Sequence, residues 1–164
     1  MTDVEQALKN GATVLAVSHV VAQGSIVNPV IELGELAKKY NVTYIVDGCQ
    51  AVGQMKVDVQ ELNCCAYVTA GRKWLRGPRG TGILYVRKDA PIHTPQIDLA
   101  SADLVLDERG SIVDVKVRND AKQFELWEKS TASLLGLTNA IQEYLDYGVE
   151  VASREIQIKA DYIR

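Results

Sequence analysis

Two continuous apolar segments joined by a helix constrain the fold of this chain more than any other feature. Residues 12–17 and 42–46 are apolar without regular alternation, which is typical of strands that are buried on both faces. Asn28-Pro29 begins a helix between them, and its apolar face contains Val30, Ile31, Leu33, Leu36 and Ala37. A strand–helix–strand unit of this kind is right-handed and sets its two strands parallel. The sequence therefore predicts an α/β fold with a mainly parallel sheet flanked by helices.

Shorter patterns predict further elements on either side of this unit. Thr2 and Glu5 have the spacing of a capping box, so we expect a helix that begins there and ends at Asn10-Gly11. Helical periodicity starts at Phe124, is broken near Gly148, and continues to the last residue. A loop is expected at residues 23–25, an irregular segment at 90–122, and strands at 56–59, 64–70, 82–86 and 112–117.

Charge and cysteine content exclude several classes of protein. The 164 residues contain 18 basic and 21 acidic side chains, so overall charge does not predict a nucleic-acid partner. No apolar run approaches the roughly 20 residues that cross a bilayer, so no membrane partner is expected. The three cysteines, Cys49, Cys64 and Cys65, are odd in number and lack metal-ligand spacing, which predicts no metal site and favours a reducing cytoplasm.

The candidate site consists of an acid and a lysine that each follow a predicted strand. Asp47 ends the segment 42–46, and Lys73 lies in a basic, glycine-rich stretch at residues 69–82. Ligands of α/β sheets bind beyond the carboxyl ends of the strands. Taken alone, Asp47 is better explained as a helix cap or turn residue, and Lys73 as a solvated loop lysine. The glycines match neither a phosphate-binding loop nor a dinucleotide fingerprint.

The combination of side chains meets the needs of pyridoxal phosphate. That cofactor requires a lysine for its aldehyde and an acid facing its ring nitrogen. It also requires a donor near the ring hydroxyl and a cation or hydroxyl group near the phosphate. Asp47, Gln50, Arg72 and Lys73 supply one residue for each requirement. Arginines in this stretch are also compatible with plain surface charge.

The motifs Val-Asp-Gly-Cys-Gln at residues 46–50 and Gly-Arg-Lys-Trp-Leu-Arg-Gly-Pro-Arg-Gly-Thr-Gly at 71–82 resemble those of class V aminotransferases. This is the branch of fold-type I pyridoxal-phosphate enzymes that includes cysteine desulfurases and isopenicillin N epimerase-like proteins. The resemblance implies that Lys73 forms the internal aldimine and shuttles protons, and that Asp47 pairs with the pyridine nitrogen. It further implies that Gln50 contacts the ring hydroxyl and that Arg72 occupies the phosphate position. The Arg-Lys pair is closer to the epimerase-like members than to typical desulfurases.

Several positions depart from the family pattern. Ala70 stands where a hydroxyl residue is expected, and Thr69 beside it offers the nearest alternative. Glu128 stands where desulfurases have a threonine that reaches the phosphate of the neighbouring subunit. None of the three cysteines matches the desulfurase nucleophile, so we interpret them as small buried or half-buried residues.

Family members are longer than this chain, so the resemblance implies a central fragment of the large domain. We expect residues 1–122 to form part of the cofactor-binding domain and 123–164 to be helices leading towards an absent small domain. The whole enzyme would be a transferase or lyase acting on a small amino acid, and a homodimer. Transamination, epimerisation, desulfuration and C–S lysis stay open. The alternative is a truncated or decayed domain that folds and oligomerises without turnover, and we expect this chain alone to be inactive.

Overall fold

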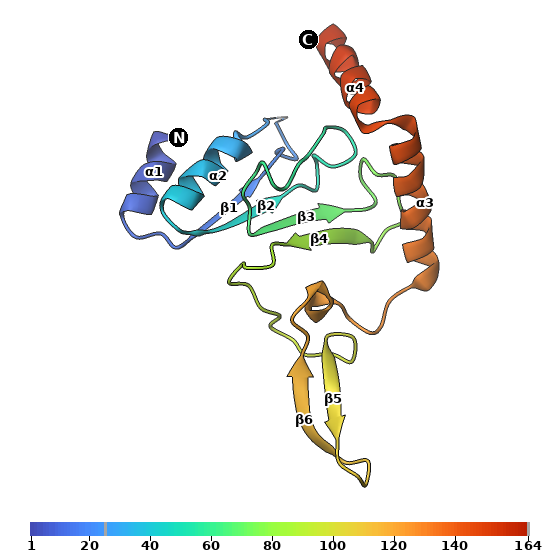
Figure 1. The fold of residues 1–164 in the computed structure, drawn as a ribbon. Coiled ribbons are helices and arrows are strands. Elements are labelled where there is room, and N and C mark those ends of the chain that lie inside the picture. Colours follow the sequence, from blue (N-terminus) through green and yellow to red (C-terminus); the bar gives the residue numbers. More distant parts are fainter. Residues whose placement is uncertain (25, 164) are drawn as a thin grey trace.

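A four-stranded sheet forms the centre of the computed structural model, which describes residues 1–24 and 26–163 (Figure 1). The strands lie in sequence order, and they are β1 (Val14–Ser18), β2 (Thr43–Asp47), β3 (Ala66–Ala70) and β4 (Gly82–Val86). The first three strands are parallel, and β4 returns antiparallel to β3. The mainly parallel sheet expected from the sequence is therefore confirmed.

Helix α2 (Val30–Lys39) connects β1 to β2 and supplies much of the core. Its buried face packs on β2, β3 and the turn before β3, and Tyr44 Oη donates a 2.9 Å hydrogen bond to the carbonyl of Val30. A Cβ on Gly34 would stand 2.0 Å from the carbonyl oxygen of Leu62, so the helix approaches that turn backbone to backbone. The core cluster comprises Val30, Leu33, Ala37, Tyr44, Val46, Leu62, Cys64 and Tyr67.

Helix α1 (Thr2–Lys9) forms without the expected capping box, so that prediction is wrong. Met1 is the N-cap residue, and no side chain caps the helix. Thr2 already lies inside the first turn, which leaves its hydroxyl in the wrong place for a cap. Glu5 instead accepts 2.8 Å hydrogen bonds from Lys39 Nζ and Tyr40 Oη, and these bonds attach α1 to the end of α2.

Two strand predictions also need correction. Strand β1 pairs only with β2, so it lies at the edge of the sheet, and Val14 is 56% exposed rather than buried. Residues 56–59 form no strand; a single bridge joins Val52 to Met55 just before them. Part of the expected loop at 23–25 is described as a turn, and residue 25 lies outside the described residues.

The segment after β4 contains a hairpin of β5 (Ala102–Leu106) and β6 (Ile112–Val117) that projects away from the sheet (Figure 1). Strand β6 confirms the expectation for 112–117, whereas β5 was not predicted. Leu104 pairs with Val115 on one face, and Asp103 pairs with Lys116 on the other. The hairpin therefore has an apolar face and a charged face.

The helical region begins later than its periodicity suggested. Residues 121–124 form the 3₁₀ helix η1 (Ala121–Phe124), and α3 (Thr131–Tyr147) starts after Ser130, whose Oγ accepts a 3.2 Å hydrogen bond from Ser133 N. The predicted break at Gly148 is confirmed, with φ of 98°, and α4 (Val149–Ile163) follows; Arg164 lies outside the described residues. None of the helices in the described part of the chain is long and apolar enough to cross a membrane.

Candidate active site

Asp47 lies at the carboxyl end of β2, where a short turn fixes its backbone and carboxylate. Its Oδ1 accepts a 2.9 Å hydrogen bond from Cys49 N, and its carbonyl accepts one of 2.8 Å from His19 N. Gly48 N donates 2.8 Å to the carbonyl of Val68 on β3. The Asp47 side chain is exposed at the carboxyl end of β2. The backbone around it is hydrogen-bonded to the ends of both neighbouring strands.

The turn after Asp47 rests on a buried polar pair. A Cβ on Gly48 would lie 2.0 Å from a ring carbon of Tyr67, so only glycine fits this contact. The Tyr67 hydroxyl lies 2.9 Å from His19 Nδ1. Burial raises the pKa of Tyr67 above its ordinary value and lowers the pKa of His19 below 6.5. Both side chains are therefore neutral at neutral pH and act as structural support.

The lysine loop, residues 71–81 between β3 and β4, is closed by its own backbone. Gly71 N donates to Thr81 O and Gly77 N donates to Gly71 O, both at 2.8 Å. Thr81 Oγ1 donates 2.7 Å to Pro78 O, and Arg76 adopts a φ of 61°. These contacts give the loop a defined shape. Lys73 is half-buried within it, and Arg72 is exposed beside it.

Three of the four predicted site residues, Asp47, Arg72 and Lys73, influence the pKa of the Cys49 thiol. Burial raises the pKa of Cys49, as do a hydrogen bond and the negative charge of Asp47. The positive charges of Lys73 and Arg72 act in the opposite direction. The carboxylate, the amine and the guanidinium are therefore within electrostatic reach of one point beyond the carboxyl ends of β2 and β3.

Gln50 belongs to the same turn as Asp47 but faces a different space from Lys73. It lines a cavity of about 790 Å³, together with Val20 and Arg154. Lys73 lines a second cavity of about 560 Å³, together with Tyr147 and Glu155. The structure thus places Asp47, Arg72 and Lys73 at the same end of the sheet, at or after the ends of β2 and β3, and does not place Gln50 and Lys73 in one cavity.

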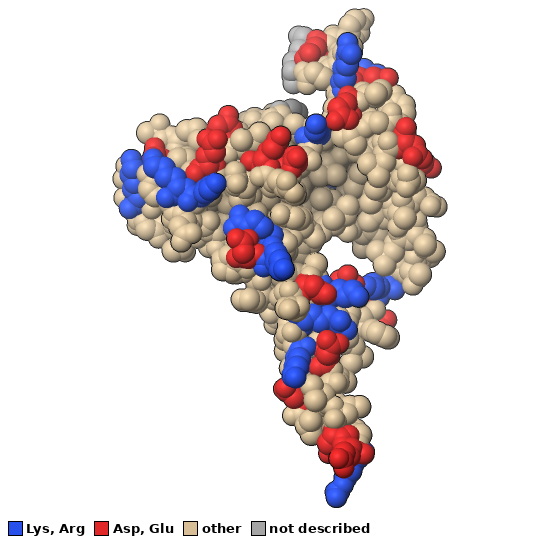
Figure 2. Space-filling model, in the orientation of Figure 1, with Lys and Arg blue, Asp and Glu red and all other residues tan. Residues whose placement is uncertain are grey.

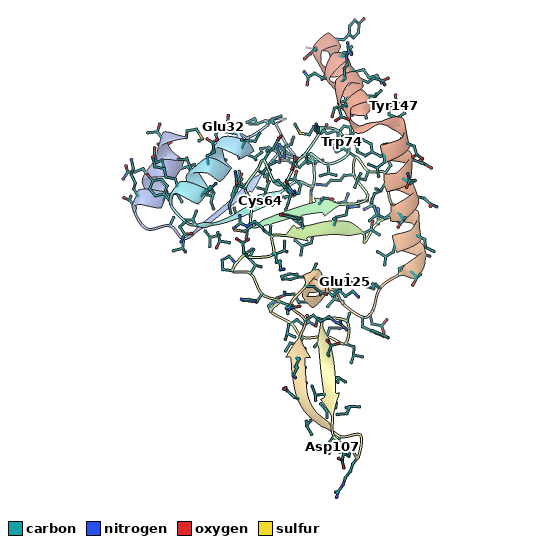
Figure 3. The ribbon with its side chains drawn as sticks, in the orientation of Figure 1. Glu32, Cys64, Trp74, Asp107, Glu125 and Tyr147 are labelled. Carbon is teal, nitrogen blue, oxygen red and sulfur yellow. The ribbon has the colours of Figure 1, made fainter. Side chains whose placement is uncertain are left out.

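Trp74 contributes to both cavities, and sequence reasoning did not assign it a role. Figure 3 shows Trp74 close to Tyr147 at the junction of α3 and α4. The position of Trp74 directly after Lys73 is the feature of the sequence that could have suggested a role at the site. The contributions of α4, which include Arg154 and Glu155, had no signal in the sequence because they depend on how that helix packs.

The strand before the lysine loop offers no hydroxyl group that could replace one at position 70 as a phosphate contact. Thr69 and Ala70 are consecutive residues of β3, so their side chains point to opposite faces of the sheet. The Thr69 hydroxyl is buried and has no hydrogen-bond partner among the described residues. Thr69 therefore does not replace a hydroxyl at position 70.

The donor set nonetheless fits pyridoxal phosphate. A carboxylate for a protonated ring nitrogen, an amine for an aldehyde and a guanidinium for a phosphate are carried by the segments at the carboxyl ends of the adjacent strands β2 and β3. Figure 2 shows Lys and Arg intermixed with Asp and Glu over the visible face of the molecule, so this local arrangement does not reflect a charged surface as a whole.

The fold and the site define an α/β domain with a mainly parallel sheet and a candidate ligand site at the carboxyl ends of its strands. A sequence model of the family "Aminotransferase class-V" matches residues 1–164. The chain belongs to that family.

Curated relatives include a cysteine desulfurase of Yersinia pseudotuberculosis, 33% identical over 158 residues, which cover 96% of this chain and 37% of the relative. A probable cysteine desulfurase of Halalkalibacterium halodurans is 29% identical over 160 residues, or 98% of this chain and 38% of that protein. The chain therefore spans less than two fifths of the length of these relatives.

Solved structures agree with the fold. The apo cysteine desulfurase of Thermococcus onnurineus NA1 has a TM-score of 0.76 and 28% identity, covering 91% of this chain and 36% of the other. A C-DES mutant with glycine covalently linked to its pyridoxal-phosphate cofactor has a TM-score of 0.73 and 22% identity, covering 92% and 40%. The second likeness supports the fold alone.

Proposed function

We propose that this chain is part of a pyridoxal-phosphate-dependent enzyme that transforms a small amino acid. In this proposal Lys73 attaches the cofactor, Asp47 pairs with its ring nitrogen, Gln50 contacts its ring hydroxyl and Arg72 contacts its phosphate. The observation that carries the proposal is that Asp47 and the lysine loop lie at the carboxyl ends of the adjacent parallel strands β2 and β3, at the same end of the sheet. Residues 1–122 would belong to the cofactor-binding domain and 123–164 to the helices that follow it.

When bound, pyridoxal phosphate supplies an electron-poor ring that accepts an electron pair from the substrate α-carbon. The Asp47 carboxylate holds the proton on the ring nitrogen, because a nearby anion favours the charged form of a base. The Lys73 amine would hold the cofactor's aldehyde and would move a proton at the α-carbon of the substrate. The Arg72 guanidinium holds the phosphate with paired hydrogen bonds.

Transferase and lyase chemistry both suit these residues. Cysteine desulfurases are prominent among the relatives, so desulfuration of cysteine is one candidate reaction beside transamination, epimerisation and C–S lysis. The three free cysteines suit a reducing cytoplasm. We further propose that the working protein is a homodimer, because apolar side chains of the β5–β6 hairpin are exposed.

A second candidate is a domain that folds and oligomerises without turnover. The observation that favours it is the separation of Gln50 from Lys73, which line different cavities on either side of Trp74. Ala70 and Glu128 also remove two contacts that a phosphate receives in related enzymes. In this case cofactor would bind weakly or not at all, and an amino-acid substrate would not be converted.

Covalent trapping separates the two candidates. The 164-residue chain is incubated with pyridoxal phosphate, reduced with borohydride, digested, and mapped by mass spectrometry. We expect a phosphopyridoxyl adduct on Lys73 that is lost in Lys73→Arg and retained in the matched variant Lys88→Arg. Labelling of exposed lysines with Lys73 unmodified would contradict the cofactor assignment. Release of pyruvate or sulfide from cysteine by this chain would contradict our expectation that it is inactive alone.

A further inference from the structure

A third cavity in the described part of the chain lies away from the lysine loop. It has a volume of about 880 Å³ and is formed by the end of β4, residues 90–97, and the join between β6 and η1. Gly82 at the other end of β4 pairs with Ala70, directly before the lysine loop. The two sites are therefore separated by the length of β4, roughly 13 Å at the usual rise of a strand.

The walls of this cavity combine an apolar surface with positive charge. Its apolar side chains are Val86, Ile92, Ile97, Val117 and Phe124. Its charged side chains are Arg87, Lys88 and Arg118 against a single acid, Asp120. The carboxylate of Asp120 is occupied in capping η1, where it accepts a 3.0 Å hydrogen bond from Lys122 N. The size is within the usual range of small-molecule sites, about 300 to 1,000 Å³.

The cations differ in how far the protein already satisfies them. Arg87 Nε donates 2.6 Å to Asp89 Oδ1, and its Nη1 donates 3.1 Å to the carbonyl of Asn63. Arg118 Nη2 lies 2.7 Å from Asp103 Oδ1, but Arg118 Nε is buried without a hydrogen-bond partner among the described residues. The Arg118 side chain is 33% exposed, so an acceptor from outside the chain can reach the guanidinium and pair with this donor.

We propose that this cavity is a second small-molecule site that binds an amphiphilic carboxylate. Its apolar part contacts Phe124 and the aliphatic side chains, and its carboxylate lies between Arg118 and Lys88. Each arginine is already paired with one acid, so a singly charged carboxylate suits the cavity better than a doubly charged phosphate. The site is independent of the Lys73 chemistry and gives the chain a ligand besides its cofactor and substrate.

Decanoate is a suitable probe, titrated into the ¹⁵N-labelled chain and followed by NMR. We expect shifts at Val86, Phe124 and Arg118, and about tenfold weaker binding of uncharged 1-decanol. Lys88→Gln should weaken binding about threefold and Arg118→Gln about tenfold or more. Arg109→Gln removes the same charge at the hairpin turn and should leave the affinity unchanged, as should Lys73→Arg.

Three results would overturn the proposal. One is equal affinity for decanoate and decanol, and another is shifts confined to the apolar face of the hairpin at Leu104 and Val115. The third is unchanged affinity in the charge variants. Circular dichroism establishes that each variant is folded. If Arg118→Gln is unfolded because it loses the bond to Asp103, Lys88→Gln is the charge test, since Lys88 is exposed.

Discussion

The hydrogen bond between Tyr67 and His19 supports the turn that carries Asp47. Tyr67→Phe removes the hydroxyl while the ring still fills the space against Gly48. We expect a loss of about 1 to 2 kcal/mol in the free energy of unfolding, because His19 Nδ1 then stays buried without its partner. Urea denaturation measures this loss. Tyr85→Phe on the neighbouring strand has no such buried partner and should change stability little; equal effects of the two variants would contradict the role of the bond.

His19 also predicts a pH dependence of stability. Burial lowers its pKa in the folded state below the ordinary 6.5, so the unfolded chain binds a proton more readily. The stabilisation is therefore present above pH 6.5 and is lost as pH falls through the folded pKa. Urea midpoints measured from pH 7.5 to 5 should decrease, and His19→Gln should flatten that decrease.

Carboxylates do not account for the change expected in this window. Glu5, Asp89 and Glu150 have pKa values lowered below their ordinary 4.5, 3.8 and 4.5, so they titrate at more acidic pH. A slope between pH 7.5 and 5 that is the same in His19→Gln and in the unaltered chain would show that His19 is not its source.

At this scale the sequence predicted that Asp47 and the lysine loop stand at the ends of strands, and it missed the residues that support them. Asp47 and Lys73 follow apolar runs directly, so their positions at strand ends could be inferred from local pattern. Tyr67 lies on β3 and His19 directly follows β1, so they meet only when the sheet is assembled. Trp74 is adjacent to Lys73, but its contact with two cavities depends on α4.

At the scale of elements, α3 holds the lysine loop through closely packed small residues. A Cβ on Gly71 or on Gly77 would approach Leu137 Cδ1 to 2.8 Å, and one on Gly136 would approach Pro78 Cγ to the same distance. Leu137 is 5% exposed and belongs to a cluster with Leu75 and Tyr144. The contact between helix and loop therefore fixes the segment that carries Lys73.

Leu137→Ala tests this contact. We expect a loss of about 2 to 5 kcal/mol in unfolding free energy, since the truncation leaves a cavity against the loop. We also expect faster borohydride trapping of exposed lysines relative to Lys73, because the loop loses its support. Leu135→Ala on the same helix is the control; Leu135 is 62% exposed, so its truncation should change stability by less than about 0.5 kcal/mol. Similar losses in both variants would exclude a specific contact.

Predictions of helices and strands succeeded where the local sequence pattern determines the structure. They failed where packing against other elements determines it. The βαβ unit, β6 and the break at Gly148 follow from continuous apolar runs, alternation and a glycine with positive φ. The exposure of β1 could not be predicted, because apolar content does not show whether a strand is central or at an edge. The capping box failed because Glu5 is used by α2.

The whole molecule exposes more surface than a folded monomer of its mass. An 18.0 kDa globular protein is expected to expose about 8,000 Å², whereas this chain exposes 11249 Å². Part of the excess is the apolar face of the hairpin, where the exposed side chains are Leu104, Leu106, Ile112, Val115 and Val117. The excess of roughly 3,000 Å² exceeds the roughly 800 Å² that one partner buries in a standard interface.

We therefore expect the chain to associate with a second copy through the apolar face of the hairpin. Val115 lies at the centre of this face, so Val115→Lys places a charge where apolar surface must be buried and should convert the dimer to a monomer in sedimentation equilibrium. Asp114→Lys also introduces a lysine into β6, but on the charged face, and should remain dimeric. A monomeric unaltered chain at tens of micromolar would refute the dimer. Equal dissociation of both variants would instead place the contact elsewhere, because position 115 lies on the apolar face and position 114 does not.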